Sequence, residues 1–264
     1  MKKISIIMPA YNEEKRIGKT LVYYSQFFDE LMQKGKMDYE IIVVINNTRD
    51  RTHVIVEEAQ RVNRHIRFLN LKEGGKGLAV IAGFKDALQR DATIIGFVDA
   101  DMATPPTALY ELMRSMNGHD GIIAARWRPD STIINPWGVL GNLKSFVFNT
   151  LVRILFLFPY RDTQCGAKLF KREAIASVSD GIGITRWAFD IELLYKMRKQ
   201  GFSIAEAPTV WENKEDTKIK LIKASAEMFL AVVRLRLVHS PLSFVVSAYD
   251  ALPEQLKIHH RIWR

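Results

Sequence analysis

Short apolar runs alternate with longer amphipathic stretches throughout the first hundred residues of this chain. Four of the runs predict buried strands, at 4–8, 40–45, 66–70 and 93–98, with Pro9 ending the first. The stretches between them predict three helices: 13–33 with Asn12 as its N-cap, 52–62, and a third from the 74–77 turn to about 88. Such alternation predicts a parallel sheet of the nucleotide-binding α/β type.

The second half of the chain continues this pattern less regularly. In chain order it predicts helix 107–116, strand 121–125, loop 129–142, a markedly apolar helix 143–158, strand 167–170 and helix 188–200. The composition changes in character near residue 216. We therefore expect one large domain over 1–215 and a C-terminal amphipathic helical extension over 216–264.

The charge of the chain favours an anionic partner, because Lys and Arg exceed Asp and Glu by nine. Nucleotides and membrane surfaces both fit this charge. A nucleic-acid-binding module would fit it too, but we find no binding motif and no aromatic residues interleaved with the basic ones. The single cysteine, Cys165, excludes an internal disulfide and is typical of a reducing compartment. We expect no signal peptide, because the first strand begins within the first residues of the sequence, and no transmembrane helix, because no apolar run is long enough.

Two aspartates, Asp99 and Asp101, directly follow the run at 93–98. The carboxyl end of a parallel strand is where an open α/β sheet places its ligands. Two carboxylates this close repel each other unless protons or a cation intervene. Their oxygens are suitable ligands for Mg²⁺ or Mn²⁺, which can in turn hold a diphosphate. A helix cap before Pro105 is the alternative interpretation, and we favour the metal site.

Three other loops are expected at the same edge of the sheet. After the first strand, Pro9 can bend the chain so that Tyr11 meets a base, and Glu13 can accept from ribose hydroxyls. The alternative is a helix cap with an acidic first turn. Asn46, after the second strand, can contact base or ribose, or can form an Asx turn. Lys76, in a glycine-rich turn at a helix N-terminus, suits an anion, although the turn is not a Walker motif.

Charged and polar residues also follow the later elements. Arg126 comes directly after strand 121–125, Gln164 lies in the loop after the apolar helix, and Asp190 begins the next helix. Cys165 sits in the same loop as Gln164. No sequence feature lowers the pKa of its thiol, so a small buried filler is the favoured interpretation over a nucleophile.

Together, these motifs resemble the family-2 glycosyltransferases of the GT-A fold. The matching set is Pro9–Glu13, Gly75–Gly77, Asp99–Asp101, Arg126, Asp162–Gly166 and Asp190, and the resemblance covers about residues 1–215. The longer stretch Asp162–Phe170 is most similar to the polyprenyl-phosphate sugar synthases, among them the dolichyl-phosphate mannose synthases and β-glucosyltransferases. Asp99–Thr104 and Arg186–Asp190 favour the glucosyl branch.

The resemblance implies an inverting, metal-dependent transferase that moves a hexose from UDP-glucose or GDP-mannose to a polyprenyl (dolichyl) phosphate. A family-2 enzyme with a saccharide or other non-lipid acceptor would share the donor site and stays an open alternative. The resemblance implies that Pro9, Tyr11 and Glu13 line the nucleotide and that Asp99 and Asp101 address the diphosphate through Mg²⁺ or Mn²⁺. It implies that Arg126 meets the acceptor phosphate or the developing charge, that Gln164 lies near the sugar, and that Asp190 lies near the acceptor. Lys144 is a second candidate for the acceptor phosphate.

Two positions depart from the family pattern. The usual Asp-Asp-Gly-Ser after the second strand is replaced by Ile45–Thr48, so that the amide of Asn46 stands where an acidic contact to the base is expected. Mannose synthases often have Gln where this chain has Ala103. The first departure puts the identity of the base in doubt, and the second leaves one metal ligand to water or another group.

Two helices support a lipid partner. Helix 143–158 is rich in apolar residues, but it is short and contains too many polar residues to span a bilayer comfortably. Helix 218–238 carries four charged residues on one face: Lys220, Lys223, Glu227 and Arg234. Basic amphipathic helices of this kind lie in the membrane interface and are attracted to anionic lipids. The alternative is that both are core helices or contacts between copies of the chain. We expect a protein bound peripherally to the cytoplasmic side of a membrane, or a cytoplasmic one.

Overall fold

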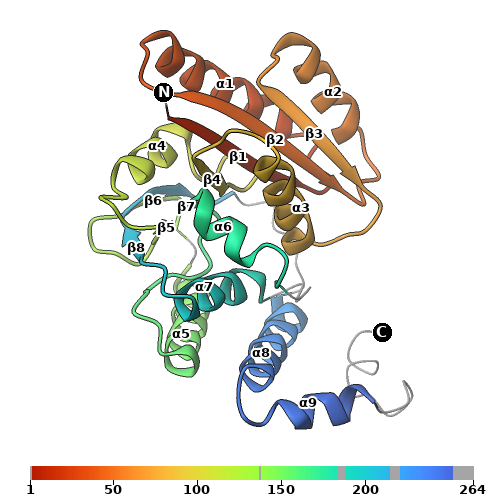
Figure 1. Cartoon of the computed structure of the whole chain (residues 1–264), viewed down its shortest axis with the longest axis vertical. Helices are drawn as coiled ribbons and strands as arrows, with labels where there is room; N and C mark the ends of the chain where they lie inside the picture. The colour runs from red at the N-terminus through yellow and green to blue at the C-terminus, as the bar shows by residue number, and fades with distance from the viewer. Residues whose placement is uncertain (1, 137, 183–187, 215–220, 252–264) are drawn as a thin grey trace.

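The computed structural model describes residues 2–136, 138–182, 188–214 and 221–251 of the 264-residue chain (Figure 1). Its helices are α1 Ile17–Gln33, α2 Thr52–Val62, α3 Lys76–Leu88, α4 Pro106–Arg114, α5 Val139–Phe156, α6 Arg172–Val178, α7 Phe189–Lys199, α8 Leu221–Val238 and α9 Ser243–Asp250. Its strands are β1 Lys3–Ala10, β2 Asp38–Asn46, β3 Ile66–Leu71, β4 Ile94–Phe97, β5 Gly121–Ala124, β6 Thr132–Ile134, β7 Lys168–Lys171, β8 Ile204–Ala207 and β9 Val210–Glu212.

One mixed sheet organises the molecule, with strand order β3-β2-β1-β4-β7-β5-β8. The first four strands pair in parallel, as the strand–helix alternation predicts. Strand β7 lies between β4 and β5 and runs antiparallel to both. A separate ladder joins β6 to β9 in parallel. The α/β fold class predicted from the sequence is confirmed.

Apolar side chains form a core on each face of the main sheet. Helices α1, α2 and α4 cover one face with residues that include Tyr24, Phe28 and Leu109. Helices α3, α6 and α7 cover the other face, and buried side chains of α5 and α8 join this second core. Burial on both faces explains why the central strands are continuous apolar runs, because neither side of them meets water.

The structure corrects two expectations at the start of the chain. Pro9 does not end β1, which continues to Ala10 and pairs Pro9 with Val44 of β2. The pairing with β4 ends at Ile7, so the missing N–H of Pro9 costs no ladder bond on that side. Asn12 does not cap the first helix, because α1 begins at Ile17 after Arg16. Asn12 instead adopts a left-handed backbone with a φ of 53°.

Later in the chain, the predicted loop 129–142 contains β6 and the first turn of α5. Helices α6 and α9 and strands β8 and β9 were not predicted. For the predicted helix 218–238, Lys220 lies outside the described residues, as does the side chain of Lys223. No helix in the described part of the chain is both long and apolar enough to cross a bilayer.

Candidate active site

The candidate site lies where the carboxyl ends of β1, β2, β4 and β5 meet the amino end of β7. The antiparallel register places Lys168, at the start of β7, opposite both Phe97 at the end of β4 and Ile123 near the end of β5. Loops from both halves of the chain therefore converge on one edge of the sheet. This is the position at which open α/β sheets bind ligands.

The carboxylate pair is surrounded by cations. Asp99 Oδ1 lies 2.5 Å from Nζ of Lys76, which begins α3. Gly166 packs directly against the other oxygen: a Cβ built at residue 166 would lie 1.8 Å from Asp99 Oδ2. The carboxylate of Asp101 instead accepts the backbone N–H of Ala103 at 2.9 Å. The contacts of Asp99 thus come from α3 and from the loop before β7, whereas the contact of Asp101 comes from its own loop.

The two carboxyl groups have opposite pKa shifts. Burial raises the pKa of Asp99, but the charges of Lys76, Lys168 and Arg126 outweigh burial and leave it below its ordinary value. Burial and the negative charge of Asp99 raise the pKa of Asp101 above its ordinary value. The cations of the site therefore neutralise Asp99 more fully than Asp101, and Asp101 carries the charge that an additional cation would stabilise.

These two carboxylates fit a divalent cation that is shared with a substrate. No group of three or more His, Cys, Asp or Glu side chains that could hold a metal gathers within the described residues. Mg²⁺ is commonly held by one or two carboxylates, with phosphate oxygens and water completing its six ligands. Asp101, with Asp99 beside it, matches that donor set. Within the described residues, the protein itself does not supply enough ligands to complete the coordination of a metal.

The loops after β1 and β2 bind each other. Asn12 Oδ1 accepts the N–H of Arg49 at 2.9 Å, and the N–H of Glu13 donates to Thr52 Oγ1 at 2.8 Å. A cavity of about 530 Å³ opens between these loops, with lining residues Asn12, Glu13, Glu14, Lys15, Arg16, Arg49 and Asp50. Its position, beyond the carboxyl ends of β1 and β2, suits a nucleoside.

Asn46 connects three segments of this edge. Its Nδ2 donates to the carbonyl of Ala10 at 3.1 Å, and its Oδ1 accepts the N–H of Gly75 at 3.1 Å. The residue is buried, with 4% of its surface exposed. These bonds hold the end of β1 and the turn before α3 in place. Asn46 therefore has a structural role at this edge of the sheet.

The other predicted nucleotide contacts differ in exposure. Tyr11 is exposed over 53% of its surface, and Pro9 is half-buried at the end of β1. The carboxylate of Glu13 receives two bonds from the guanidinium of Arg16, at 2.7 and 2.8 Å. Burial raises the pKa of Glu13, although Arg16 opposes this shift. Tyr11 precedes Asn12, which lines the cavity, and an exposed aromatic ring is suited to stacking on a base.

Arg126 is fixed by a buried carboxylate. Its Nε and Nη2 donate to Asp162 at 2.7 and 3.0 Å, and its backbone N–H donates to the same carboxylate at 3.0 Å. Its guanidinium carbon lies 5.2 Å from the ring centroid of Trp211 in β9. Burial favours the neutral form, but Asp162 outweighs this and raises the pKa of Arg126. Arg126 is therefore a permanently charged, pre-oriented group.

The loop that carries Asp162 and Gln164 is tied to neighbouring elements. The carboxylate of Glu206 in β8 accepts the N–H groups of Arg161 and Asp162 at 2.6 and 2.8 Å. Asn149, buried on α5, accepts the N–H of Thr163 at 3.0 Å. Gln164 itself is half-buried and donates to Thr163 Oγ1 at 3.1 Å.

Lys168 was not predicted as a functional residue. Its ammonium is fully buried, donates to Asp190 Oδ1 at 2.5 Å and to the carbonyl of Cys165 at 2.6 Å, and lies 5.2 Å from the ring centroid of Phe97. It thereby joins Asp190 to the edge that bears Asp99. A lysine inside an otherwise apolar strand was the available signal, because a buried ammonium requires a charged partner.

Two other predicted residues have simpler environments. Lys144 is exposed on α5, and within the described residues no hydrogen bond or ion pair joins it to Arg126, Gln164 or Asp190. Cys165 is buried, and burial raises the pKa of its thiol to about 11, as expected for a filler residue. Arg186 and Trp187 of the predicted Arg186–Asp190 motif lie outside the described residues.

Comparison with known proteins gives consistent relatives. The profile of glycosyl transferase family 2 matches residues 5–178. A dolichyl-phosphate β-glucosyltransferase of Dictyostelium discoideum is 32% identical over 243 residues, which cover 88% of this chain and 73% of that protein. The dolichyl-phosphate β-glucosyltransferase of Homo sapiens is 32% identical over 232 residues, which cover 83% of this chain and 70% of that protein.

Among solved structures, the chain resembles glucosyl-3-phosphoglycerate synthase of Mycobacterium tuberculosis. The complex of that protein with Mn²⁺, UDP and glucosyl-3-phosphoglycerate aligns with a TM-score of 0.65 at 18% identity. The alignment covers 89% of this chain and 80% of that one. At this identity the similarity concerns the fold, which is the GT-A arrangement predicted from the sequence.

Proposed function

Because the chain belongs to glycosyl transferase family 2, we propose that it transfers a hexose from a nucleotide sugar to a polyprenyl phosphate of the dolichyl type. The observation that carries this proposal is the similarity to dolichyl-phosphate β-glucosyltransferases along most of the chain. Those relatives favour glucose as the sugar. UDP-glucose is therefore the first donor to test, and GDP-mannose is the second.

On the donor side, the nucleoside occupies the cavity between the loops after β1 and β2, with Tyr11 stacked on the base. The diphosphate lies at the N-terminus of α3, near Lys76 and the carboxylate pair. A divalent cation, Mg²⁺ or Mn²⁺, held by Asp101 with Asp99 beside it would neutralise the charge of the leaving diphosphate when bound. Lys76 supplies a fixed positive charge to the same region.

On the acceptor side, an oxygen of the lipid phosphate forms the new bond to the anomeric carbon. The bond from that carbon to the diphosphate breaks, and the nucleoside diphosphate leaves with the electron pair. A single displacement of this kind inverts the anomeric configuration. A phosphate monoester has a second pKa of about 6, so it is largely ionised near neutral pH and requires no strong general base.

The main role of the side chains near the acceptor is therefore to orient the acceptor phosphate and the sugar, and not to transfer protons. Arg126, held by Asp162, faces the charge of the acceptor phosphate and stabilises it as the bond forms. Asp190, held by Lys168, orients the acceptor or the sugar. Gln164 contacts the sugar, and Lys144 is a weaker candidate for the acceptor phosphate because of its place on the exposed side of α5.

The proposed acceptor requires access to a membrane surface. We propose peripheral attachment to the cytoplasmic side, where nucleotide sugars are available, and a division into a glycosyltransferase domain at 1–215 and a helical extension at 216–264. The C-terminal helices can serve either as membrane contacts or as contacts between copies of the chain. The basic character of the whole sequence supports attraction to anionic lipids.

Sugar transfer with separately supplied donors tests the proposal. Radiolabelled UDP-glucose, GDP-mannose and UDP-N-acetylglucosamine are each offered with polyprenyl phosphate and Mg²⁺ or Mn²⁺. We expect label in the organic phase from UDP-glucose. Label from GDP-mannose alone would change the donor, and donor hydrolysis without a lipid product would favour a saccharide or other non-lipid acceptor. If none of the three donors is bound, hydrolysed or used for transfer in a metal-dependent way, the proposal is refuted.

Replacement of one carboxylate separates metal-dependent chemistry from folding. We expect Asp101→Asn to reduce turnover by about 10²-fold or more, because the substitution removes the charge that draws a cation to the diphosphate. The thermal unfolding midpoint should change little, since Asp101 makes no ion pair among the described residues. Full metal-dependent activity in the variant would contradict the assignment.

A further inference from the structure

Helix α5 and the residue that follows it expose a row of apolar side chains to solvent, interrupted by Thr150. Its members are Leu143 (55% exposed), Phe146 (57%), Val147 (56%), Ile154 (67%) and Leu157 (80%). The four members within α5 share one face at helical spacing, and Leu157 directly follows the last residue of the helix. Val152 and Phe156, on the opposite face, are buried in the core. We call this face the α5 stripe. A soluble monomer rarely exposes so many large apolar side chains in one row.

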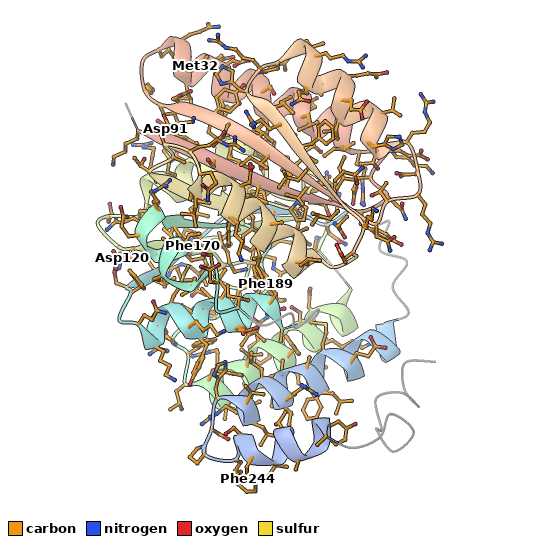
Figure 2. The ribbon with its side chains drawn as sticks, turned by 45° about the vertical axis from the view of Figure 1, so that its right-hand side comes forward. Met32, Asp91, Asp120, Phe170, Phe189 and Phe244 are labelled. Carbon is orange, nitrogen blue, oxygen red and sulfur yellow. The ribbon has the colours of Figure 1, made fainter. Side chains whose placement is uncertain are left out.

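The neighbouring helices extend the apolar surface. The described residues of α8, α9 and their connection add Phe229, Leu230, Val238, Leu242, Phe244 and Val245, each exposed over at least 43% of its surface. Figure 1 shows α5, α8 and α9 gathered at one end of the molecule, beyond the sheet, and Figure 2 shows Phe244 at that end, far from Met32. The guanidinium of Arg236 in α8 donates to the carbonyl of Leu155 at 2.8 Å and joins the two helices.

The charges beside the α5 stripe indicate which partner covers it. Lys144 and Arg153 are both exposed and flank the stripe on opposite sides at helical spacing. Helix α5 contains no Asp or Glu. A second copy packed face to face would bring these cations together, because the same surface meets itself in a twofold dimer. Lipid phosphates complement them, and bilayer interiors complement the stripe.

The buried side of α5 is connected to the candidate site. Asn149 accepts the N–H of Thr163, in the loop whose Asp162 holds Arg126. A surface bound through the α5 stripe would therefore lie next to the loop that we propose to receive the acceptor phosphate. This part of the argument rests on the proposed function, whereas the binding of a bilayer does not.

We propose that the α5 stripe, with Lys144 and Arg153 at its margins, is the face by which this protein docks on an anionic lipid bilayer. The stripe enters the interface between head groups and acyl chains, and the two cations bind lipid phosphates. Helices α8 and α9 widen the apolar contact. The docked protein presents the loop of Asp162 to lipids whose phosphate lies at the membrane surface.

Vesicle flotation with the full-length chain tests this proposal. The vesicles contain phosphatidylcholine with or without phosphatidylglycerol. We compare the wild type with the double variant Phe146→Glu/Ile154→Glu, whose side chains are exposed and whose substitution leaves the core unchanged. The matched control is Val62→Glu on α2, an apolar side chain that is 90% exposed outside this end of the molecule. Thermal unfolding verifies that all three are folded.

We expect the wild type and Val62→Glu to float with anionic vesicles, and the double variant to bind at least about 10-fold more weakly. Equal binding by the double variant and the wild type would overturn the proposal, as would a wild type that forms dimers through this face and does not float. A second assay compares a short, water-soluble polyprenyl phosphate with a long one in vesicles. The double variant should lose transfer only to the long acceptor. Flotation without transfer to either acceptor would refute the proposed function and leave the docking face standing.

Discussion

At the scale of single residues, Gly166 allows the carboxylate of Asp99 to pack against the backbone. It has no side chain where a Cβ would lie 1.8 Å from Asp99 Oδ2. We expect Gly166→Ala to displace Asp99 from Lys76 and to lower turnover by about 10²-fold, because small displacements at a reacting centre have effects of that size. The measurement is steady-state transfer from the nucleotide sugar. Gly138→Ala is the control, since a Cβ there meets nothing within 4 Å, and equal losses in both variants would contradict the prediction.

Lys168 is the residue at which stability and site geometry are most closely linked. We expect Lys168→Met to lower the free energy of unfolding by about 3–5 kcal/mol, because it leaves the carboxylate of Asp190 without its buried partner. Adding Asp190→Asn should restore part of that loss. Urea unfolding of the two single variants and the double variant measures the coupling. Lys171→Met, in the same strand but at a partly exposed pair, should cost at most about 1 kcal/mol.

Sequence reasoning singled out charged residues of the candidate site but not their hydrogen-bond and ring partners. Asp99, Arg126 and Asp190 were recognised because each follows a predicted strand or begins a helix. The partners Trp211 and Glu206 were not recognised, because they reach the site from β9 and β8 after more than 40 further residues. Such contacts depend on the register of strands that pair far from one another in the chain. A single sequence contains no local signal for that register.

At the scale of secondary structure, the side-chain amide of Asn149 connects α5 to the loop of Asp162 and Thr163. We expect Asn149→Ala to leave the N–H of Thr163 without a partner in a buried position and to destabilise the fold by about 1–3 kcal/mol. The turnover number should fall while the KM for the nucleotide sugar stays unchanged, since the donor loops lie on other strands. Kinetics with varied donor measures both constants. Thr150→Ala, the next residue of α5, is the control, and a raised donor KM in Asn149→Ala alone would contradict this division.

Elements with a strong local pattern were predicted well. Helix α2 was predicted with its observed bounds, and β1 to β4 were each found within two residues at either end. Strands β6, β8 and β9 were missed. Most of their residues are exposed or only partly buried, so they lack the buried apolar run that marks the equally short β4 and β5. Helix α1 starts later than predicted because Asn12 bonds to Arg49 in the neighbouring loop, which removes it from the role of a cap.

At the scale of the whole molecule, Asp120 joins three strands of the sheet. Its carboxylate accepts the N–H and the hydroxyl of Ser203, before β8, and the ammonium of Lys171 in β7, each at 2.9 Å. The bond from the N–H of Ser203, followed by that from Lys171, lowers the pKa of Asp120 from 3.8 to about 2. The unfolded chain therefore binds more protons than the folded one between these values. The contribution of Asp120 is complete above pH 3.8 and is lost as the pH falls through about 2.

We therefore expect the stability difference between the wild type and Asp120→Asn to depend on pH. It should be constant at neutral and mildly acidic pH, and should shrink once the pH falls below the ordinary pKa of the carboxyl group. Urea midpoints measured over a series of acidic buffers give the difference directly. A difference that stays the same down to the lowest pH would show that the bonds of Asp120 do not depend on its charge.

The place of β7 in the sheet has a consequence for synthesis on the ribosome. Strands β4 and β5 emerge first and point the same way, but the finished sheet keeps them apart with β7, which follows them in the chain. A nascent chain that has reached β5 can pair it directly with β4, and this premature ladder must open before β7 can enter. Chain elongation is slow compared with strand pairing, so this trap has time to form. The geometry that brings Lys168 between two parallel strands thus leaves the centre of the sheet without its final pairing until residues 168–171 have been synthesised.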